Sequence, residues 1–279
     1  MVDKTCLVTG ATSGIGYETA LGLARLGATV IITARDSARG IATLERIKAE
    51  TTNPEVHLFL VDFASLQSVR DFTDSFLSKY DRLHVLINNA GAALKHRTLT
   101  VDGFECVFQV NQLAPFLLTN LLLPTLMASA PARIVTVASD AHRTGHIDFE
   151  NLMSEKRYGP WYTYANSKLA NVMFSMSLAE KLQATTVTSN ALHPGAVKTN
   201  IGKESLFSIR LIYHLFGPIM LTPKEGAKTS IYLATSPEVN GLTGGYYAKC
   251  KPAKLNPEVL DRDLRSALWD RCAEMVGLV

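Results

Sequence analysis

The amino-acid sequence predicts an α/β fold, a doubly wound parallel sheet of about seven strands with helices on both faces. Short apolar, β-branched runs alternate with longer segments of helical periodicity from residue 5 to residue 192. A glycine-rich turn joins the first apolar run to the first helical segment. No linker, low-complexity tract or repeat divides the chain. We therefore expect residues 1–279 to form a single Rossmann-like domain.

The predicted elements follow the chain in strand–helix order. The expected strands are rich in β-branched residues and cover residues 5–8, 29–34, 56–61, 84–87, 134–137 and 187–192. The expected helices have apolar residues at helical spacing and cover residues 13–26, 38–50, 66–80, 104–128 and 162–183. Residues 206–220 and 257–276 also read as helices. Strands that alternate with longer helices indicate a parallel sheet covered on both faces.

The composition excludes several classes of function. A chain of 279 residues with 47% hydrophobic residues can form a large core. With 19% charged residues and a net charge of +3, it has no basic stripe for nucleic acid. The cysteines are scattered, so we expect free thiols, a reducing compartment and no metal site; they are Cys6, Cys106, Cys250 and Cys272. We also expect no signal peptide, no integral membrane segment and a cytoplasmic location.

The glycine turn lies where the first strand leads into the first helix and reads Thr9-Gly10-Ala11-Thr12-Ser13-Gly14-Ile15-Gly16. At such a junction glycines let the backbone approach a pyrophosphate, and the helix N-terminus offers free amides to the anion. The spacing is GxxxGxG rather than the commoner GxGxxG, and an ordinary glycine-rich turn is the alternative. Its position favours dinucleotide binding by Gly10, Thr12, Ser13, Gly14, Ile15 and Gly16.

The end of the second strand bears on the choice of cofactor. It reads Thr33-Ala34-Arg35-Asp36. A carboxylate near the position of Ala34 would accept the ribose hydroxyls of NAD, which alanine cannot do. The guanidinium of Arg35 could instead bind a 2′-phosphate by charge-assisted hydrogen bonds. A solvated arginine paired with Asp36 is the alternative, and we expect NADP(H).

Tyr164 and Lys168 lie four residues apart in the helical segment 162–183. Four residues are about one helical turn, so the phenol and the ammonium project from the same face. A nearby cation favours the ionised phenol and lowers its pKa from about 10. The pair predicts a general acid/base. A solvated surface pair is the alternative, and the motifs around the pair argue against it.

Six motifs in order make the chain resemble the short-chain dehydrogenases/reductases, from Lys4 to about Tyr247. Besides the glycine turn and the Tyr164–Lys168 pair, they are Asn88-Asn89-Ala90-Gly91, Asn111, Ser139 and His193-Pro194-Gly195. The run Thr33-Ala34-Arg35-Asp36 and the long insert between Ser139 and Tyr164 resemble the retinol-dehydrogenase-like branch. The same insert departs from many family members, in which the serine and the tyrosine are closer in sequence.

The resemblance implies a role for each matching residue. Tyr164 would exchange a proton with a carbonyl or alcohol oxygen while NADP(H) exchanges a hydride at the carbon. Ser139 would hydrogen-bond that oxygen, and a helix or turn cap is its alternative role. Lys168 would lower the pKa of Tyr164 and bind the nicotinamide ribose. Asn111 would support a water-mediated proton path to the lysine, and an exposed mid-helix asparagine is the alternative.

Further cofactor contacts are implied after three of the strands. Asp62 would contact the adenine ring, although it could equally cap the following helix. Phe63, next to Asp62, is another implied contact. Further implied contacts follow the fourth strand at Asn89, Ala90 and Gly91, and the sixth strand at Pro194, Gly195, Val197 and Thr199.

Residues 206–220 place apolar side chains on one helix face. The resemblance implies that this region belongs to a substrate lid at about residues 200–222, which would cover an apolar substrate. A helix packed on the core or on a second subunit is the alternative, and shallow membrane contact stays open. We expect an NADP(H)-dependent enzyme that reduces an apolar ketone or aldehyde, or oxidises the matching alcohol. A non-catalytic NADP-binding regulatory scaffold is the competing hypothesis, and a homodimer is an open expectation.

Overall fold

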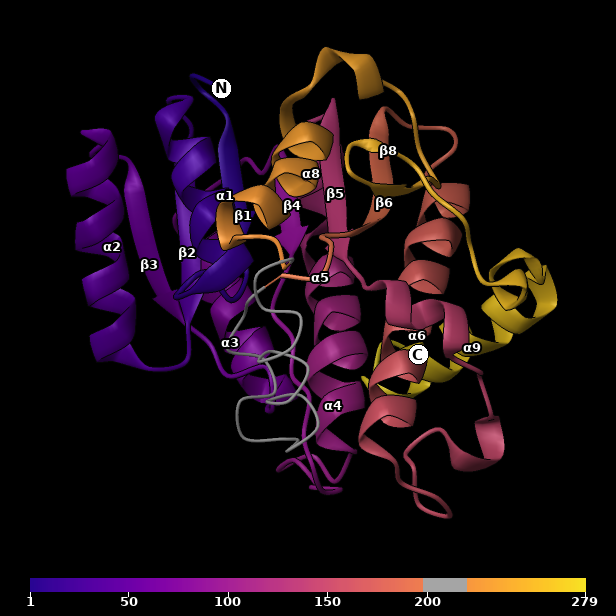
Figure 1. The fold of residues 1–279 in the computed structure, drawn as a ribbon. Coiled ribbons are helices and arrows are strands. Elements are labelled where there is room, and N and C mark those ends of the chain that lie inside the picture. The colour runs from indigo at the N-terminus through magenta and orange to yellow at the C-terminus, as the bar shows by residue number, and fades with distance from the viewer. Residues whose placement is uncertain (198–219) are drawn as a thin grey trace.

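The computed structural model describes residues 1–197 and 220–279. In this part of the chain, eight strands form one sheet in the order β3-β2-β1-β4-β5-β6-β7-β8 (Figure 1). They are β1 (Thr5–Val8), β2 (Thr29–Ala34), β3 (Val56–Leu60), β4 (Val85–Asn88), β5 (Ala132–Val137), β6 (Val187–His193), β7 (Tyr246–Ala248) and β8 (Lys251–Pro252). Every neighbouring pair is parallel except β7 and β8. The predicted α/β class is confirmed, with one short antiparallel strand beyond the expected seven.

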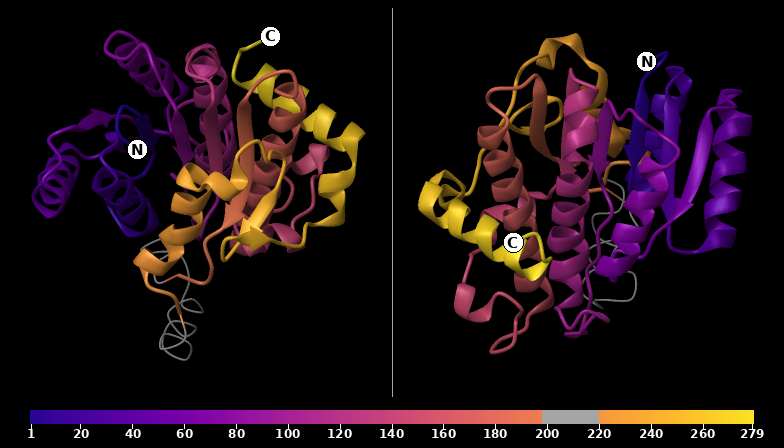
Figure 2. Two further views of the ribbon diagram at one scale, coloured as in Figure 1. Left: turned by 90° about the horizontal axis from the view of Figure 1, so that it is seen from above. Right: turned by 180° about the vertical axis from the view of Figure 1, so that it is seen from behind.

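Helices cover both faces of the sheet (Figure 2). One layer contains α1 (Gly14–Arg25), α2 (Ser37–Thr51) and α8 (Pro223–Thr235). The other contains α3 (Leu66–Leu77), α5 (Ala114–Ala128) and α6 (Pro160–Lys181), with α9 (Arg262–Met275) packed outside α6. The last helix starts later than predicted, because Pro257–Leu260 forms a separate 3-10 turn.

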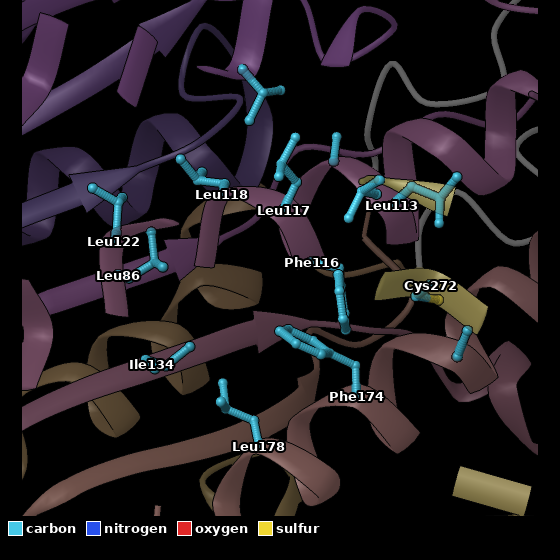
Figure 3. Packing of buried hydrophobic residues seen from close by; sticks show 14 of the residues in the cluster. Leu86, Leu113, Phe116, Leu117, Leu118, Leu122, Ile134, Phe174, Leu178 and Cys272 are labelled. Carbon is cyan, nitrogen blue, oxygen red and sulfur yellow. The ribbon is translucent and has the colours of Figure 1, made fainter. Parts of the chain in front are cut away.

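The larger of the two main hydrophobic cores lies between the sheet and the layer of α3, α5 and α6. Phe116 and Phe174 meet there with ring centroids 5.3 Å apart, close to Leu178 and Ile134 (Figure 3). The two central strands β1 and β4 are mostly apolar and buried, as expected for a parallel sheet that is covered on both faces. Burial of these side chains contributes about 25 cal/mol per Å² of apolar area removed from water.

The predicted helix at residues 104–128 is divided in the structure. It consists of α4 (Cys106–Phe108), a π-helical turn at Gln109–Leu113 and α5. The span Cys106–Ala128 is long and apolar enough to cross a membrane by length and composition, a test that the core helix of a globular protein also passes. In this structure 72% of its most apolar window is buried inside the protein. It thus packs here as a core element of the larger cluster.

The strand order reverses at β1. The chain adds β2 and β3 on one side of it, and β4, β5 and β6 on the other. In open α/β sheets, ligands bind outside the carboxyl ends of the strands at such a reversal. The segments that follow β1, β4, β5 and β6 hold most of the residues singled out in the sequence.

Candidate active site

The glycine turn packs directly against the turn that follows β4. Gly10 has a positive φ of 64°, and a Cβ there would lie 2.8 Å from Ala90 Cα. A Cβ at Gly16 would collide with the Gly10 carbonyl oxygen and with Asn89 Nδ2. Gly14 also has a positive φ, of 60°. These positions therefore need glycine, because the backbone takes a left-handed conformation or lies against a second turn.

Thr9 ties the two turns together. Its hydroxyl accepts hydrogen bonds from the N–H groups of Asn89 and Ala90, both at 2.9 Å. Asn89 Nδ2 donates to the Thr9 carbonyl at 2.8 Å. Asn89, Ala90 and Gly91 therefore lie next to Gly10, as the motifs predict.

The N-terminus of α1 opens onto a cleft of about 430 Å³. Ser13 occupies the N-cap position, and its side chain makes no capping hydrogen bond in the described structure. Thr12, Ser13 and Gly14 line the cleft, and Arg39 of α2 lines it as well. A helix N-terminus with a nearby guanidinium is a favourable site for an anion. Arg39 was not singled out in the sequence, although it follows Arg35 by four residues.

The residues after β2 and β3 lie in turns that lead into α2 and α3. Asp36 caps α2 by accepting from Arg39 N at 2.7 Å, and Arg35 is exposed beside it. Asp62 accepts from Ala64 N at 3.0 Å within a tight turn. The N-cap of α3 is Ser65, so the interpretation of Asp62 as a helix cap is wrong. Phe63 is buried in the larger core.

Asn111 is buried in the π-helical turn, so the alternative of an exposed mid-helix position is wrong. Its Oδ1 accepts from Ala92 N at 2.7 Å, and its Nδ2 donates to Ala92 O at 3.0 Å and to Ser167 Oγ at 2.9 Å. The side chain thus joins the loop after Gly91 to α6, the helix that carries Tyr164 and Lys168.

Lys168 is buried, with 5% of its surface exposed, which rules out a solvated surface pair. Its Nζ lies 5.8 Å from the Tyr164 ring centroid and donates to Val137 O at 2.9 Å and to Asn171 Oδ1 at 3.1 Å. An ammonium has three N–H groups, so one is left without a partner among the described residues and could bind a ligand. Burial lowers the pKa of Lys168 to about 8.

Tyr164 is half-buried one turn before Lys168. Burial raises the pKa of its phenol because the phenolate loses contact with water, and interaction with the Ser139 side chain lowers it. The predicted lowering by Lys168 is therefore wrong for the described structure, in which burial is the largest effect. The interaction shows that the side chains of Ser139 and Tyr164 lie together at the carboxyl end of β5.

Ser139 follows β5 by two residues and is the N-cap of the 3-10 turn Asp140–Thr144. Its Oγ accepts from Ala141 N at 3.2 Å. Ser139 therefore has the capping role that was considered as the alternative. It is compatible with a ligand contact, since a hydroxyl keeps its own hydrogen for donation when its oxygen accepts.

Asn171 is a site residue that the sequence analysis missed. Its Nδ2 donates to Asn111 O at 2.6 Å, while its Oδ1 accepts from Lys168. The Asn111 carbonyl is available because Pro115, four residues later, has no N–H to donate to it. An amide side chain therefore joins Asn111 to the lysine. The i, i+3 spacing from Lys168 is the signal that could have indicated it.

The segment after β6 lies against the glycine turn. Gly195 has a φ of 94°, and a Cβ there would collide with Leu221. Val197 pairs with Leu221 in a short bridge and packs against Ile15 of α1. Pro194 leads into this segment. Thr199 and most of the expected lid at 200–222 lie outside the described residues.

Three further findings concern metal binding and the insert between Ser139 and Tyr164. In the described part of the chain, no group of three or more His, Cys, Asp or Glu side chains could hold a metal ion. In the insert between Ser139 and Tyr164, His142 is fully buried. Trp161 is 59% exposed, and its ring centroid lies 6.4 Å from that of Tyr164.

Comparison with known proteins identifies the class. A family model described as short chain dehydrogenase matches residues 4–207. The chain belongs to this family of oxidoreductases, which use a nicotinamide cofactor. Retinol dehydrogenase 14 of Mus musculus is 44% identical over 100% of this chain and 87% of its own length. Retinol dehydrogenase 12 of Homo sapiens is 42% identical over 99% and 87%. Within its family, the chain is retinol-dehydrogenase-like.

Solved structures have the same fold. An uncharacterised protein from Mycobacterium Paratuberculosis has a TM-score of 0.81 and 33% identity, over 99% of this chain and 94% of its own. A short chain dehydrogenase from Escherichia coli CFT073, solved in complex with NADPH, has a TM-score of 0.72 and 25% identity, over 90% and 98% of the two chains.

Proposed function

We propose that this protein is an NADP(H)-dependent oxidoreductase that reduces an apolar ketone or aldehyde, or oxidises the matching alcohol. The observation that carries the proposal is the meeting of Ser139, Tyr164 and Lys168 at the carboxyl end of β5, beside the glycine turn. A regulatory scaffold that only binds a nucleotide has no need for a half-buried tyrosine beside a buried lysine.

The chemistry assigns one task to each side chain. The cofactor supplies or receives the hydride. Tyr164 donates its phenolic proton to the carbonyl oxygen in reduction and takes it back in oxidation. Ser139 donates a hydrogen bond to the same oxygen and stabilises the charge that develops on it. The raised pKa of Tyr164 keeps the phenol protonated, as proton donation requires.

Lys168 has one N–H group without a partner in the described part of the chain, and we assign this group to a ribose hydroxyl of the cofactor. Asn111 positions this part of the site through its bonds to Ala92 and Ser167 and through Asn171. We assign the pyrophosphate to the N-terminus of α1, where Thr12, Ser13 and Gly14 line the cleft. The residues proposed to hold the cofactor are Gly10, Thr12, Ser13, Gly14, Ile15, Gly16, Arg35, Asp62, Phe63, Asn89, Ala90, Gly91, Tyr164, Lys168, Pro194, Gly195, Val197 and Thr199.

NADP(H) is preferred over NAD(H) in this proposal. Ala34 offers no carboxylate to the ribose, while Arg35 is exposed at the end of β2 and Arg39 lines the cleft at the start of α1. Two guanidinium groups can neutralise a 2′-phosphate. The NADPH complex of the related Escherichia coli protein is consistent with this choice.

The substrate is proposed to be bulky and apolar, such as a retinoid or a steroid-like compound. The retinol dehydrogenases among the relatives support this class. Exposed Trp161 beside Tyr164 provides an apolar surface at the entrance to the site. The cytoplasmic location, the homodimer and membrane contact through residues 200–222 stay predictions.

Replacement of Tyr164 by phenylalanine tests the proposal. Tyr164→Phe removes the proton and keeps the ring, so turnover should fall by about 10²- to 10⁴-fold while NADPH affinity stays close to that of the wild type. NADPH consumption with retinal and a panel of apolar carbonyls measures turnover, and fluorescence titration measures NADPH affinity. Tyr162→Phe, two residues earlier, is the matched control and should be nearly neutral. Full activity in Tyr164→Phe would reject the assigned chemistry.

A further inference from the structure

Two histidines hold the backbone of the Ser139 turn. His193, at the end of β6, accepts the N–H of Asp140 on its Nδ1 at 3.1 Å. His142 lies within the turn, with its Nδ1 2.8 Å from the Ser139 carbonyl oxygen. Its Nε2 accepts from Asn256 N at 3.3 Å. The peptide between Ser139 and Asp140 is therefore bonded to an imidazole at its oxygen and at its nitrogen.

The partners determine the protonation of each ring. An amide N–H can only donate, so His193 Nδ1 must carry a lone pair and its proton must lie on Nε2. A carbonyl oxygen can only accept, so His142 must carry its proton on Nδ1. Both imidazoles are neutral and in opposite tautomers. Protonation of His193 would place an N–H against the N–H of Asp140.

The turn also has little freedom to shift as a whole. A Cβ at Gly145 would lie 2.7 Å from the Ala165 carbonyl oxygen, so the end of the turn is in contact with α6 next to Tyr164. Asn256 donates to the carbonyl of Gly145 at 2.9 Å. The hydrogen bond from the Asp140 N–H to His193 Nδ1 thus connects the start of the turn to β6.

We propose that His193 is a positioning residue for Ser139, and that its neutral imidazole holds the serine hydroxyl in place through the Asp140 N–H. The inference rests on the proposed function, because it assumes that Ser139 bonds the substrate oxygen. It also makes the site sensitive to acid. Protonated His193 loses the bond, and the start of the turn, which carries Ser139, is then held less firmly in its productive position.

The charges around His193 allow this behaviour at neutral pH. Burial lowers the pKa of His193 from its ordinary value of 6.5. Asp140 acts in the opposite direction, and His142 adds to the lowering; both lie in the 3-10 turn. The neutral form therefore predominates at neutral pH, and activity should decline as the pH falls below 6.5.

Two variants of His193 distinguish the effect of the hydrogen bond to Asp140 from the effect of imidazole protonation. In His193→Asn, the amide oxygen takes the place of Nδ1 and does not titrate, so activity at neutral pH should stay within about twofold and the acid decline should disappear. His193→Leu has no acceptor, and kcat should fall by about 2- to 10-fold at every pH with unchanged NADPH affinity. His57→Asn removes an imidazole from β3, far from the site, and should keep the wild-type profile.

The outcomes that overturn the inference are distinct. An unchanged acid decline in His193→Asn, or wild-type kcat in His193→Leu, would reject it. Imidazole nitrogen chemical shifts of the ¹⁵N-labelled protein give a test without turnover. The signals lost in His193→Asn and His142→Asn should report an Nε2–H and an Nδ1–H tautomer respectively, and an Nδ1–H tautomer at His193 would reject the bond. A wild type that turns over no carbonyl would refute the proposed function, while the tautomers still decide the arrangement of the turn.

Discussion

Lys168 shows at the scale of one residue how burial sets the chemistry of the site. The ammonium is removed from water, and its polar partners among residues 1–197 and 220–279 are Val137 O and Asn171 Oδ1. Its charged form is therefore less favoured than in solvent, and the pKa falls to about 8. The side chain loses its charge as the pH rises through this value. If the ammonium binds the cofactor, activity should decline above about pH 8.

Asn171→Asp tests this dependence. The new carboxylate next to Lys168 favours the ammonium, so the pKa of the lysine rises and the alkaline decline should move upward by about one pH unit or more. The pH dependence of kcat/KM measures the change. Asn120→Asp on α5 adds the same charge away from the site and should leave the profile unaltered. An Asn171→Asp profile identical to that of the wild type would show that the lysine charge does not govern the alkaline decline.

Arg39 lines the cleft at the N-terminus of α1 and is proposed to bind the 2′-phosphate of NADPH. Arg39→Ala should weaken NADPH binding by about ten- to a hundred-fold and leave NADH binding almost unchanged, because only NADPH carries the 2′-phosphate. Titration of both cofactors measures the two effects. Arg46 lines the same cleft but is paired with Glu50 at 2.9 Å, so Arg46→Ala serves as the control with a smaller effect. Equal losses for the two cofactors would argue against a phosphate contact.

At the scale of elements, α9 stabilises the layer that carries the site. Leu268 is buried, and the Trp269 ring lies 4.8 Å from Phe116 and 5.7 Å from Phe174, centroid to centroid. Arg265 donates to Glu180 of α6 at 2.6 Å. This contact surface joins α9 to α5 and α6, and α6 carries Tyr164 and Lys168.

Leu268→Ala should lower the free energy of unfolding by about 2 to 5 kcal/mol, since it removes a buried side chain and leaves a cavity. Urea-induced unfolding measures it. Ser266→Ala changes an exposed residue of the same helix and should stay within about 0.5 kcal/mol of the wild type. A loss no larger than that of the control would mean that α9 packs too loosely to support α6.

At the scale of the whole molecule, the site lies across β1, β4, β5 and β6, so a bound cofactor would contact segments from distant parts of the chain. A ligand that binds only the folded state stabilises it by RT ln(1 + [L]/Kd), about 2.7 kcal/mol at a concentration of 100 Kd. NADPH should therefore raise the thermal unfolding midpoint more than NADH at equal concentration. Calorimetry of the full chain measures both shifts, and larger stabilisation by NADH would contradict the proposed cofactor preference.

Much of the sheet was predictable, because each of the first six strands is a local apolar run between turn residues. β1 and β2 begin and end at the predicted residues, and the other four differ by one or two residues at one or both ends. β8 was not predictable in this way, since Lys251–Pro252 is too short to have a periodicity. The π-helical turn within the predicted 104–128 helix was missed because the periodicity of five residues does not distinguish such a turn from an α-helix.

Local sequence determined the α/β class, the position of the glycine turn and the spacing of Tyr164 and Lys168, because these depend on neighbours within one turn or one strand. Tertiary structure decided the ionisation of that pair, since burial depends on segments that are distant in sequence. It also decided the contacts between Asn171 and the Asn111 carbonyl and between His193 and the Ser139 turn. Each of these bonds joins residues more than 50 positions apart, which become neighbours only when the sheet and α6 are assembled.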